Sequence, residues 1–469
     1  GTTSVATVDA SGVVTGVVAG VTTITYTLPT SCISTQDVTV NPVPAAITGA
    51  LQVCEGLSTA LSSATPGGVW TSGATGIATI ASGTGLVSAS TAGTAPVTYT
   101  LATGCLTSAN VTVNPSPAPI TGVPQVCVGY TTVLGDASTG GVWSTSAPGI
   151  ASVISGTGVV TGISMGNAII TYTLPTSCKT TAIVAVNPLP APITGAMQAC
   201  EGSTSALGDG SAGGTWSSST PLVATVSATG VVSANVAGTT LITYTLPTGC
   251  IRYNTFVVNP LPAGIAGATQ VCETNSTTLT NASTGGFWSS SSLSVATINT
   301  AGVVNALSPG TTNITYTLPT GCMRAANLTV NPMPAPIMGS LNACEAHTTT
   351  LTDATAGGTW TSGSTAVATI DAAGIVTGVV AGATTVVYTL PTGCSTSRNL
   401  VINPLPAAIA GIPQVCYGSM TALTDASTGG IWSSSSAGIA NVGLLTGVVT
   451  GLSAGTADIT YTLLTGCAT

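Results

Sequence analysis

The sequence predicts an all-β protein built from tandem β-sandwich modules. Three observations predict this fold class. Val, Ile and Leu alternate with Thr and Ser along short segments, and 44% of the residues are hydrophobic while only 3% are charged. Glycine (58 residues) and proline (27 residues) interrupt these segments at short intervals, as turns between strands do. The cysteines and tryptophans recur with a period of about 72–73 residues, which indicates an array of repeats.

The cysteines define the repeat. A first series follows this period and contains Cys32, Cys105, Cys178, Cys250, Cys322, Cys394 and Cys467. A second series has the same period and contains Cys54, Cys127, Cys200, Cys272, Cys344 and Cys416. Each tryptophan follows a second-series cysteine at the same short spacing, at Trp70, Trp143, Trp216, Trp288, Trp360 and Trp432. Each repeat ends in an Asn-Pro-x-Pro motif, which begins at Asn41, Asn114, Asn187, Asn259, Asn331 and Asn403.

These landmarks predict five complete modules between two incomplete ones. The complete modules are residues 43–115, 116–188, 189–260, 261–332 and 333–404. Residues 1–42 form the C-terminal half of a module, and residues 405–469 form a module that lacks its last strand. Because the chain opens and closes inside a repeat, we expect it to be part of a longer mature protein.

The module at residues 189–260 shows the expected order of elements in its first half. Residues 190–194 (Pro-Ala-Pro-Ile-Thr) begin an edge strand, where proline is tolerated. A turn follows at Cys200-Glu-Gly-Ser, and residues 204–207 form a short strand. A loop rich in Gly and Asp at residues 208–214 then leads to the tryptophan.

The second half of this module continues with alternating segments. A strand begins at residues 215–217 and packs Trp216 inward. Residues 223–226 and 230–233 alternate, and residues 242–246 place Ile, Tyr and Leu on one face and Thr on the other. A hairpin turn precedes the strand that contains Phe256-Val-Val and closes the sheet. About seven short strands in about 72 residues are typical of a sandwich.

Composition excludes several functional classes. Lys and Arg total 4 against 12 Asp and Glu, so no basic patch exists for nucleic acid and no polybasic stretch for a membrane surface. No run of eighteen apolar residues occurs, so we expect no membrane insertion within these residues. Regularly spaced cysteines indicate an oxidising, extracellular or cell-surface location.

The repeated motifs resemble a known family. Trp216-Ser-Ser-Ser, Val223-Ala-Thr-Val, Gly230-Val-Val-Ser and Ile242-Thr-Tyr resemble the bacterial immunoglobulin-like domain, group 2, and the same string recurs in every module. The Cys-x-Gly turn and the Gly-Cys hairpin also resemble repeats in giant surface adhesins of gliding Bacteroidota. The resemblance implies a tandem array of immunoglobulin-like β-sandwiches, arranged as an extended rod. Such modules serve as spacers and binding arms in many adhesins.

Three disulfide pairings fit the cysteine spacing. Neighbours in the sequence, such as Cys32 and Cys54, lie on strands that run end to end, so their Cα atoms cannot come within about 7 Å. A pairing within a module, of the Cys200–Cys250 type, joins opposite ends of one sandwich, about 23 Å apart over a seven-residue strand. The third and preferred pairing crosses the junction between modules and gives Cys54–Cys178, Cys127–Cys250, Cys200–Cys322, Cys272–Cys394 and Cys344–Cys467. The within-module pairing remains the second alternative, followed by free thiols or bridges between chains.

In the junction pairing, Cys32, Cys105 and Cys416 find partners outside these residues. The few charges also lie near the cysteines. Lys179, Arg252, Arg324 and Arg398 follow first-series cysteines, whereas Glu55, Glu201, Glu273 and Glu345 follow second-series cysteines directly. These charges are either solvated turn residues or polar contacts at the joint.

Catalytic and metal-binding patterns are absent from the sequence. His347 is the only histidine, and a turn residue is the simplest interpretation. Single aspartates recur before the tryptophan and are interpreted as turn formers, with a weak ion site as the alternative; they are Asp136, Asp209, Asp353 and Asp425. The aromatic core is predicted to contain the six tryptophans with Tyr99, Tyr172, Tyr244, Tyr316 and Tyr388. We therefore expect no enzyme and no cofactor.

The first functional hypothesis is a structural segment of a very long secreted surface protein that forms an extracellular fibre or filament. Its partners would be other copies of itself or neighbouring repeats of the same chain, because few charges guard the strand edges against association. The second hypothesis is the stalk of a cell-surface adhesin. The third is a carbohydrate-binding array, which requires exposed aromatic side chains, whereas the tryptophans here are predicted to be buried.

Overall fold

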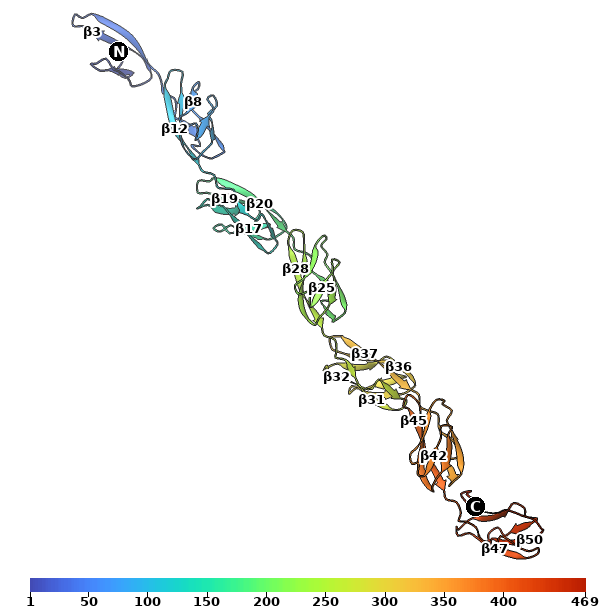
Figure 1. Ribbon diagram of the computed structural model, residues 1–469. Helices are drawn as coiled ribbons and strands as arrows, with labels where there is room; N and C mark the ends of the chain where they lie inside the picture. Colours follow the sequence, from blue (N-terminus) through green and yellow to red (C-terminus); the bar gives the residue numbers. More distant parts are fainter. The chain divides into compact units, whose positions relative to one another are not determined.

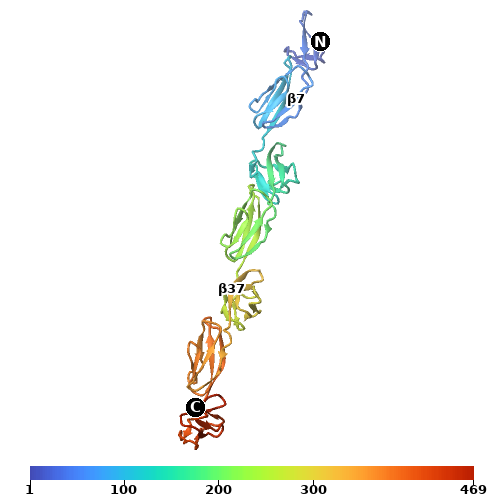
Figure 2. The same cartoon turned by 90° about the vertical axis from the view of Figure 1, so that its right-hand side faces the viewer.

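A computed structural model describes all residues from Gly1 to Thr469 and contains strands and no helices (Figures 1 and 2). No helix therefore meets the length and apolarity that a membrane crossing needs. The chain divides into two compact units. The first is Gly1–Met197, Ser205–Ser233 and Thr240–Phe256, and the second is Gln198–Thr204, Ala234–Thr239 and Val257–Thr469.

The first unit begins with β1 (Ala6–Val8), β2 (Val14–Gly16), β3 (Gly20–Thr27) and β4 (Ile33–Val40). The next strands are β5 (Thr48–Gly49), β6 (Gln52–Cys54), β7 (Ser58–Ser62), β8 (Val69–Ser72), β9 (Ala78–Ile80), β10 (Leu86–Ala89), β11 (Gly93–Thr100) and β12 (Leu106–Asn114). They are followed by β13 (Thr121–Gly122), β14 (Gln125–Cys127), β15 (Thr131–Gly135), β16 (Val142–Thr145), β17 (Ala151–Val153), β18 (Val159–Gly162), β19 (Gly166–Thr173) and β20 (Lys179–Asn187).

The middle of the chain continues with β21 (Thr194–Gly195), β22 (Gln198–Cys200), β23 (Thr204–Gly208), β24 (Thr215–Ser218), β25 (Ala224–Val226), β26 (Val231–Ala234), β27 (Gly238–Thr245) and β28 (Ile251–Asn259). The following strands are β29 (Ile265–Ala266), β30 (Gln270–Cys272), β31 (Ser276–Thr278), β32 (Thr280–Asn281), β33 (Phe287–Ser290), β34 (Ala296–Ile298), β35 (Val303–Ala306), β36 (Gly310–Thr317) and β37 (Met323–Asn331).

The last strands are β38 (Met338–Gly339), β39 (Asn342–Cys344), β40 (Thr348–Thr352), β41 (Thr359–Ser362), β42 (Ala368–Ile370), β43 (Ile375–Gly378), β44 (Gly382–Thr389) and β45 (Ser395–Asn403). The chain ends with β46 (Ala410–Gly411), β47 (Met420–Thr424), β48 (Ile431–Ser434), β49 (Ala440–Val442), β50 (Val448–Gly451) and β51 (Ile459–Thr462).

Each complete module is a sandwich of two sheets. In residues 43–115 the strand orders are β5-β7-β10-β9 and β6-β12-β11-β8, and the other complete modules repeat this topology. Residues 261–332 differ in one detail, because their first sheet is divided into β29-β32 and β31-β35-β34. The predicted all-β, immunoglobulin-like sandwich is confirmed.

The first strand of each complete module is shorter than the sequence predicts and is divided in two. Residues 190–193 form no strand, and only Thr194–Gly195 pair with β23. Proline lacks the N–H that a ladder needs, which explains why Pro190 and Pro192 stay outside the sheet. The chain then crosses to the other sheet, where β22 pairs in parallel with β28. This division gives eight short strands instead of about seven.

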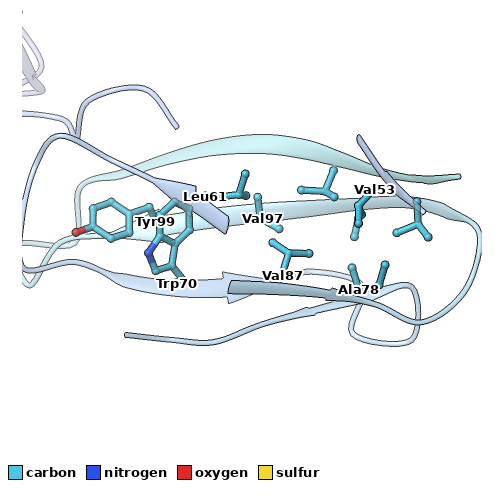
Figure 3. Close-up of a cluster of buried hydrophobic side chains, with 11 residues drawn as sticks. Val53, Leu61, Trp70, Ala78, Val87, Val97 and Tyr99 are labelled. Carbon is cyan, nitrogen blue, oxygen red and sulfur yellow. The ribbon is translucent and has the colours of Figure 1, made fainter. Parts of the chain in front are cut away.

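The core lies between the two sheets, as the cluster in residues 43–115 shows (Figure 3). Strand β11 alternates, so that Val97 and Tyr99 point into the core while Thr94 and Thr98 face outward. Leu61 from β7 and Val87 from β10 close the other side, and Val87 is fully buried. The alternation of β-branched side chains and threonine therefore sets which face of each sheet is buried.

A tryptophan and a tyrosine occupy one end of this core. The rings of Trp70 and Tyr99 lie 4.7 Å apart between centroids (Figure 3). The Tyr99 hydroxyl donates to the Thr65 carbonyl at 2.8 Å and accepts from the Gly68 N–H at 2.8 Å. The same ring pair occurs at Trp143–Tyr172, Trp216–Tyr244, Trp288–Tyr316, Trp360–Tyr388 and Trp432–Tyr461.

Candidate functional site at the module junction

The two cysteines of a module lie at opposite ends of its sheet. Cys54 is in register with Asn114, the last residue of β12. Cys105 lies in the turn that precedes β12, at the other end of that strand. A nine-residue strand is about 30 Å long, which keeps these two sulfurs far apart. Each module therefore presents one cysteine to the module before it and another to the module after it.

Five disulfides cross the junctions between successive modules. They are Cys54–Cys178, Cys127–Cys250, Cys200–Cys322, Cys272–Cys394 and Cys344–Cys467, with Cα–Cα distances of 5.6, 5.7, 5.5, 5.6 and 5.6 Å. These pairs are the preferred set from the cysteine spacing, and Cys200 does not pair with Cys250. Cys32, Cys105 and Cys416 carry free thiols.

The asparagine of each Asn-Pro-x-Pro motif lies beside its bridge. The Asn114 carbonyl accepts a hydrogen bond from the Glu55 N–H at 2.9 Å and lies 3.9 Å from the Cys178 sulfur. The Asn114 side chain is almost buried, and its Nδ2 lies 3.5 Å from the Gln52 side-chain oxygen. Ser116 donates to the Glu55 carbonyl at 2.9 Å. The linker peptide and the disulfide thus leave the module from the same corner.

The linker is also fixed to the module that follows. The Ala118 N–H donates to the Ser138 hydroxyl at 3.0 Å, and the Ser138 N–H donates to Asp136 Oδ1 at 2.7 Å. The same anchor occurs at Ala45–Thr65, Ala191–Ser211, Ala263–Ser283, Ala335–Thr355 and Ala407–Ser427. The recurring aspartates therefore shape the loop that receives the linker, in agreement with their interpretation as turn formers.

Two of the charged residues make polar contacts with linkers. Arg252 donates through Nε to the Pro190 carbonyl at 2.9 Å. Glu345 accepts from the Ala381 N–H at 2.7 Å and from the Leu405 N–H at 3.4 Å. For Arg252 and Glu345, the hypothesis of a polar contact at the joint is therefore the better one.

His347 and the six tryptophans are the remaining residues that the sequence analysis singled out. His347 is exposed, and its Nδ1 lies 2.8 Å from the Glu345 carbonyl. No group of three or more His, Cys, Asp or Glu side chains could hold a metal ion. Trp70, Trp143 and Trp432 are buried, whereas Trp216, Trp288 and Trp360 are half-buried.

Two features of the site escaped the sequence analysis. Tyr461 completes the sixth aromatic pair and is 6% exposed. Its Ile-Thr-Tyr context and its position one repeat after Tyr388 could have identified it. The hydrogen bonds between the Ala N–H and the Ser or Thr hydroxyl could not be predicted from the sequence. Only the serine or threonine recurs visibly, because every residue except proline has a backbone N–H.

Comparison with known proteins gives one family match. Residues 258–327 match the bacterial Ig-like domain (group 2). Among solved structures, the chain is similar to surface layer protein SbsC, domains 4–9, at 14% identity over 86% of this chain and 85% of that chain, with a TM-score of 0.17. The human desmocollin-1 ectodomain is 9% identical over 77% of this chain and 98% of that chain, with a TM-score of 0.15. These TM-scores are too low to bear on function, and no curated protein matches the chain.

Proposed function

We propose that this chain, a tandem array of immunoglobulin-like modules with a match to the bacterial group 2 domain, is a load-bearing structural segment. It belongs to a very long secreted surface protein that forms an extracellular fibre or filament. The module bounds are 43–115, 116–188, 189–260, 261–332 and 333–404, between the incomplete modules 1–42 and 405–469. The segment acts without catalysis, cofactor or nucleic acid.

The observation that carries this proposal is the covalent reinforcement of the junctions. At each bridged junction two covalent connections run in parallel, the Asn-Pro-x-Pro linker and a disulfide. Prolines restrict the linker, and the hydrogen bonds of Asn114 and Ala118 fix both of its ends in the junction after residue 115. A spacer that needs only to separate two domains does not require this second connection.

Exposed apolar side chains support association between copies. Val69, Thr100 and Leu106 form one cross-strand row on the outward face, and Val69 and Leu106 are each 53% exposed. The equivalent row in residues 261–332 holds Phe287 and Met323, which are also exposed. With only 3% charged residues, little repulsion opposes lateral contact at such rows. The partners proposed are therefore further copies of the chain or neighbouring repeats.

An adhesin stalk is the second candidate, because the same bridged junctions would hold a binding domain away from a cell. A carbohydrate-binding array ranks last. Its stacking surface would have to come from exposed aromatic rings, and each of the six tryptophans packs against a tyrosine inside a module.

Electron microscopy of the native material tests the proposal. A fibre predicts regular filaments that contain several chains, or one chain packed helically. Single thin threads that end in a distinct knob would instead establish the stalk. Glycan-array binding that is lost when the exposed tyrosines Tyr130, Tyr253 and Tyr417 are replaced would favour neither and would revive the carbohydrate hypothesis.

A further inference from the structure

The five bridges interleave along the chain. Cys127 lies between Cys54 and its partner Cys178, and the partner of Cys127, Cys250, lies beyond Cys178. The same crossing recurs with every later pair. Interleaved bridges of this kind do more than close separate loops. They create covalent paths through the array that are shorter than the backbone, and a pulling force can be transmitted along these paths.

Two such routes exist. We call the stretch from a first-series cysteine to the next second-series cysteine, such as 178–200, a bridge thread. One route follows threads 178–200 and 322–344, joined by Cys54–Cys178, Cys200–Cys322 and Cys344–Cys467. The other route follows threads 105–127, 250–272 and 394–416, joined by Cys127–Cys250 and Cys272–Cys394.

A bridge thread can be extended only slightly beyond its length in the folded protein. Thread 178–200 consists of β20, a proline-rich linker, and the short strands β21 and β22. Strand residues advance about 3.3 Å and polyproline residues about 3.1 Å, whereas a fully stretched chain advances about 3.3–3.6 Å. Apart from the bend between β21 and β22, the thread is therefore already close to its maximum length in the folded module.

The remaining strands of a module lie outside both routes. In residues 116–188 the two threads are neighbours, because β14 of one pairs in parallel with β20 of the other. Strands β15 to β19 lie between Cys127 and Cys178, and so connect one thread to the other. Tension along the array is carried by β14 and β20, while the five strands β15 to β19 are shielded from it.

We propose that the interleaved bridges make the array a two-threaded tether that cannot lengthen by unfolding. An unbridged module of about 72 residues stretches to about 250 Å when it unfolds under force, several times its folded length. Between Cys54 and Cys467 the release is limited to the small slack of the threads, even if every module in that stretch loses its fold. The limit follows from the bridges alone and applies equally to a fibre and a stalk, and only its biological use rests on the proposed load-bearing function.

Single-molecule stretching of the 469-residue chain by its two ends tests the tether directly. The thiols of Cys32, Cys105 and Cys416 are blocked first to prevent exchange. The shortest oxidised route uses residues 1–54, 178–200, 322–344 and 467–469, about 100 residues in all. Reduction frees the whole chain, so the fully stretched length increases about fourfold to fivefold.

A matched pair of variants separates this proposal from simpler bridge patterns. Removing one bridge of the shortest route, with Cys200→Ser and Cys322→Ser, forces the tension through residues 1–54, 127–178, 250–272, 344–394 and 467–469, a longer route of about 180 residues. Removing Cys127–Cys250 with the equivalent serines also costs one disulfide, but it leaves the shortest route intact and the stretched length unchanged.

Equal lengthening by both variants would overturn the proposal, because bridges confined within modules would each release a similar loop. An oxidised chain that stretches to its full 469 residues would overturn it as well. The stretched length depends on covalent connectivity and not on folding, so repeating the measurement in denaturant keeps the test valid for a variant that folds poorly. Native material without filaments would reject the fibre and leave this length limit untouched.

Discussion

The hairpin of residues 1–42 and the hairpin of residues 116–188 have the same strands in different surroundings. Strands β3 and β4 pair over eight residues, as β19 and β20 do. Tyr26 in the first hairpin is 70% exposed, whereas the equivalent Tyr172 is 5% exposed. The difference lies in the first half of the module, which supplies Trp143 and the loop that binds the tyrosine hydroxyl. Strand pairing is thus local, and burial depends on the other half of the module.

Of the changes considered, removing the tryptophan should make the hairpin of a complete module most similar to the exposed hairpin of residues 1–42. Trp143→Ala is expected to destabilise residues 116–188 by about 3–5 kcal/mol, because it leaves a cavity beside Tyr172. Hydrogen exchange in β19 and β20, followed by mass spectrometry, measures the effect. Val142→Ala is the control, since Val142 precedes Trp143 on the same strand and is 55% exposed. Similar exchange in both variants would mean that the hairpin does not need this core.

Substitution of Gly141, which lies beside Tyr172, should also destabilise the module, by somewhat less than loss of the tryptophan. An added Cβ at Gly141 would lie 2.5 Å from the Tyr172 ring. Gly141→Ala should therefore displace the ring and cost about 1–3 kcal/mol, measured by the same exchange in β19. Gly149→Ala is the matched control, because nothing lies within 4 Å of a Cβ at that position. A neutral Gly141→Ala would show that the ring can move aside freely.

The tyrosine hydroxyl permits a direct test between the two hairpins. Tyr172 donates to the Ser138 carbonyl at 2.7 Å and accepts from the Gly141 N–H at 2.9 Å. Tyr172→Phe leaves both groups without this partner and should cost about 1–2 kcal/mol. Tyr26→Phe should change the exchange of β3 and β4 very little, because that side chain is largely exposed. An equal loss in both hairpins would contradict the assignment of Tyr172 to a buried corner.

The sequence predicts the sandwich and its repeat because both depend on local patterns. Alternating Thr with Val or Ile marks each long strand, and the Cys, Trp and Asn-Pro-x-Pro landmarks set the period. The divided first strand could not be predicted in the same way. Whether β5 or β6 joins a given sheet depends on partners such as β7 and β12, and β12 is the last strand of the module.

The junction was predictable only in part. The cysteine pairing follows from which end of the sandwich each cysteine occupies, and the order of turns and strands along the chain determines those ends. The contacts of Arg252 and Glu345 depend on the local path of the linker, which brings the Pro190 carbonyl and the Leu405 N–H within reach. Equivalent positions such as Glu55 and Arg324 share the spacing, so spacing alone does not indicate those contacts.

The smallest expected effect concerns the loop that receives the linker, which has no counterpart in residues 1–42. In four modules the second carboxylate oxygen of the loop aspartate is buried without a hydrogen-bond partner, at Asp136, Asp209, Asp353 and Asp425. At the equivalent position Asn281 donates from Nδ2 to the Ala263 carbonyl at 2.7 Å, and Ser63 donates to the Ala45 carbonyl at 3.0 Å. A carboxylate oxygen without a proton cannot make this donation.

Asp136→Asn should therefore stabilise the loop that accepts the Tyr172 hydroxyl, by about 1 kcal/mol. The new amide retains Oδ1 as the acceptor for Ser138 and adds a donor toward the linker carbonyl. Exchange of the β19 and β20 amides at neutral pH should slow in this variant. The converse change, Asn281→Asp, should accelerate exchange in β36 and β37 by removing the donor to Ala263. If both substitutions weaken their modules, the buried oxygen has a partner other than the linker carbonyl, and the aspartate is then the residue that fits this loop best.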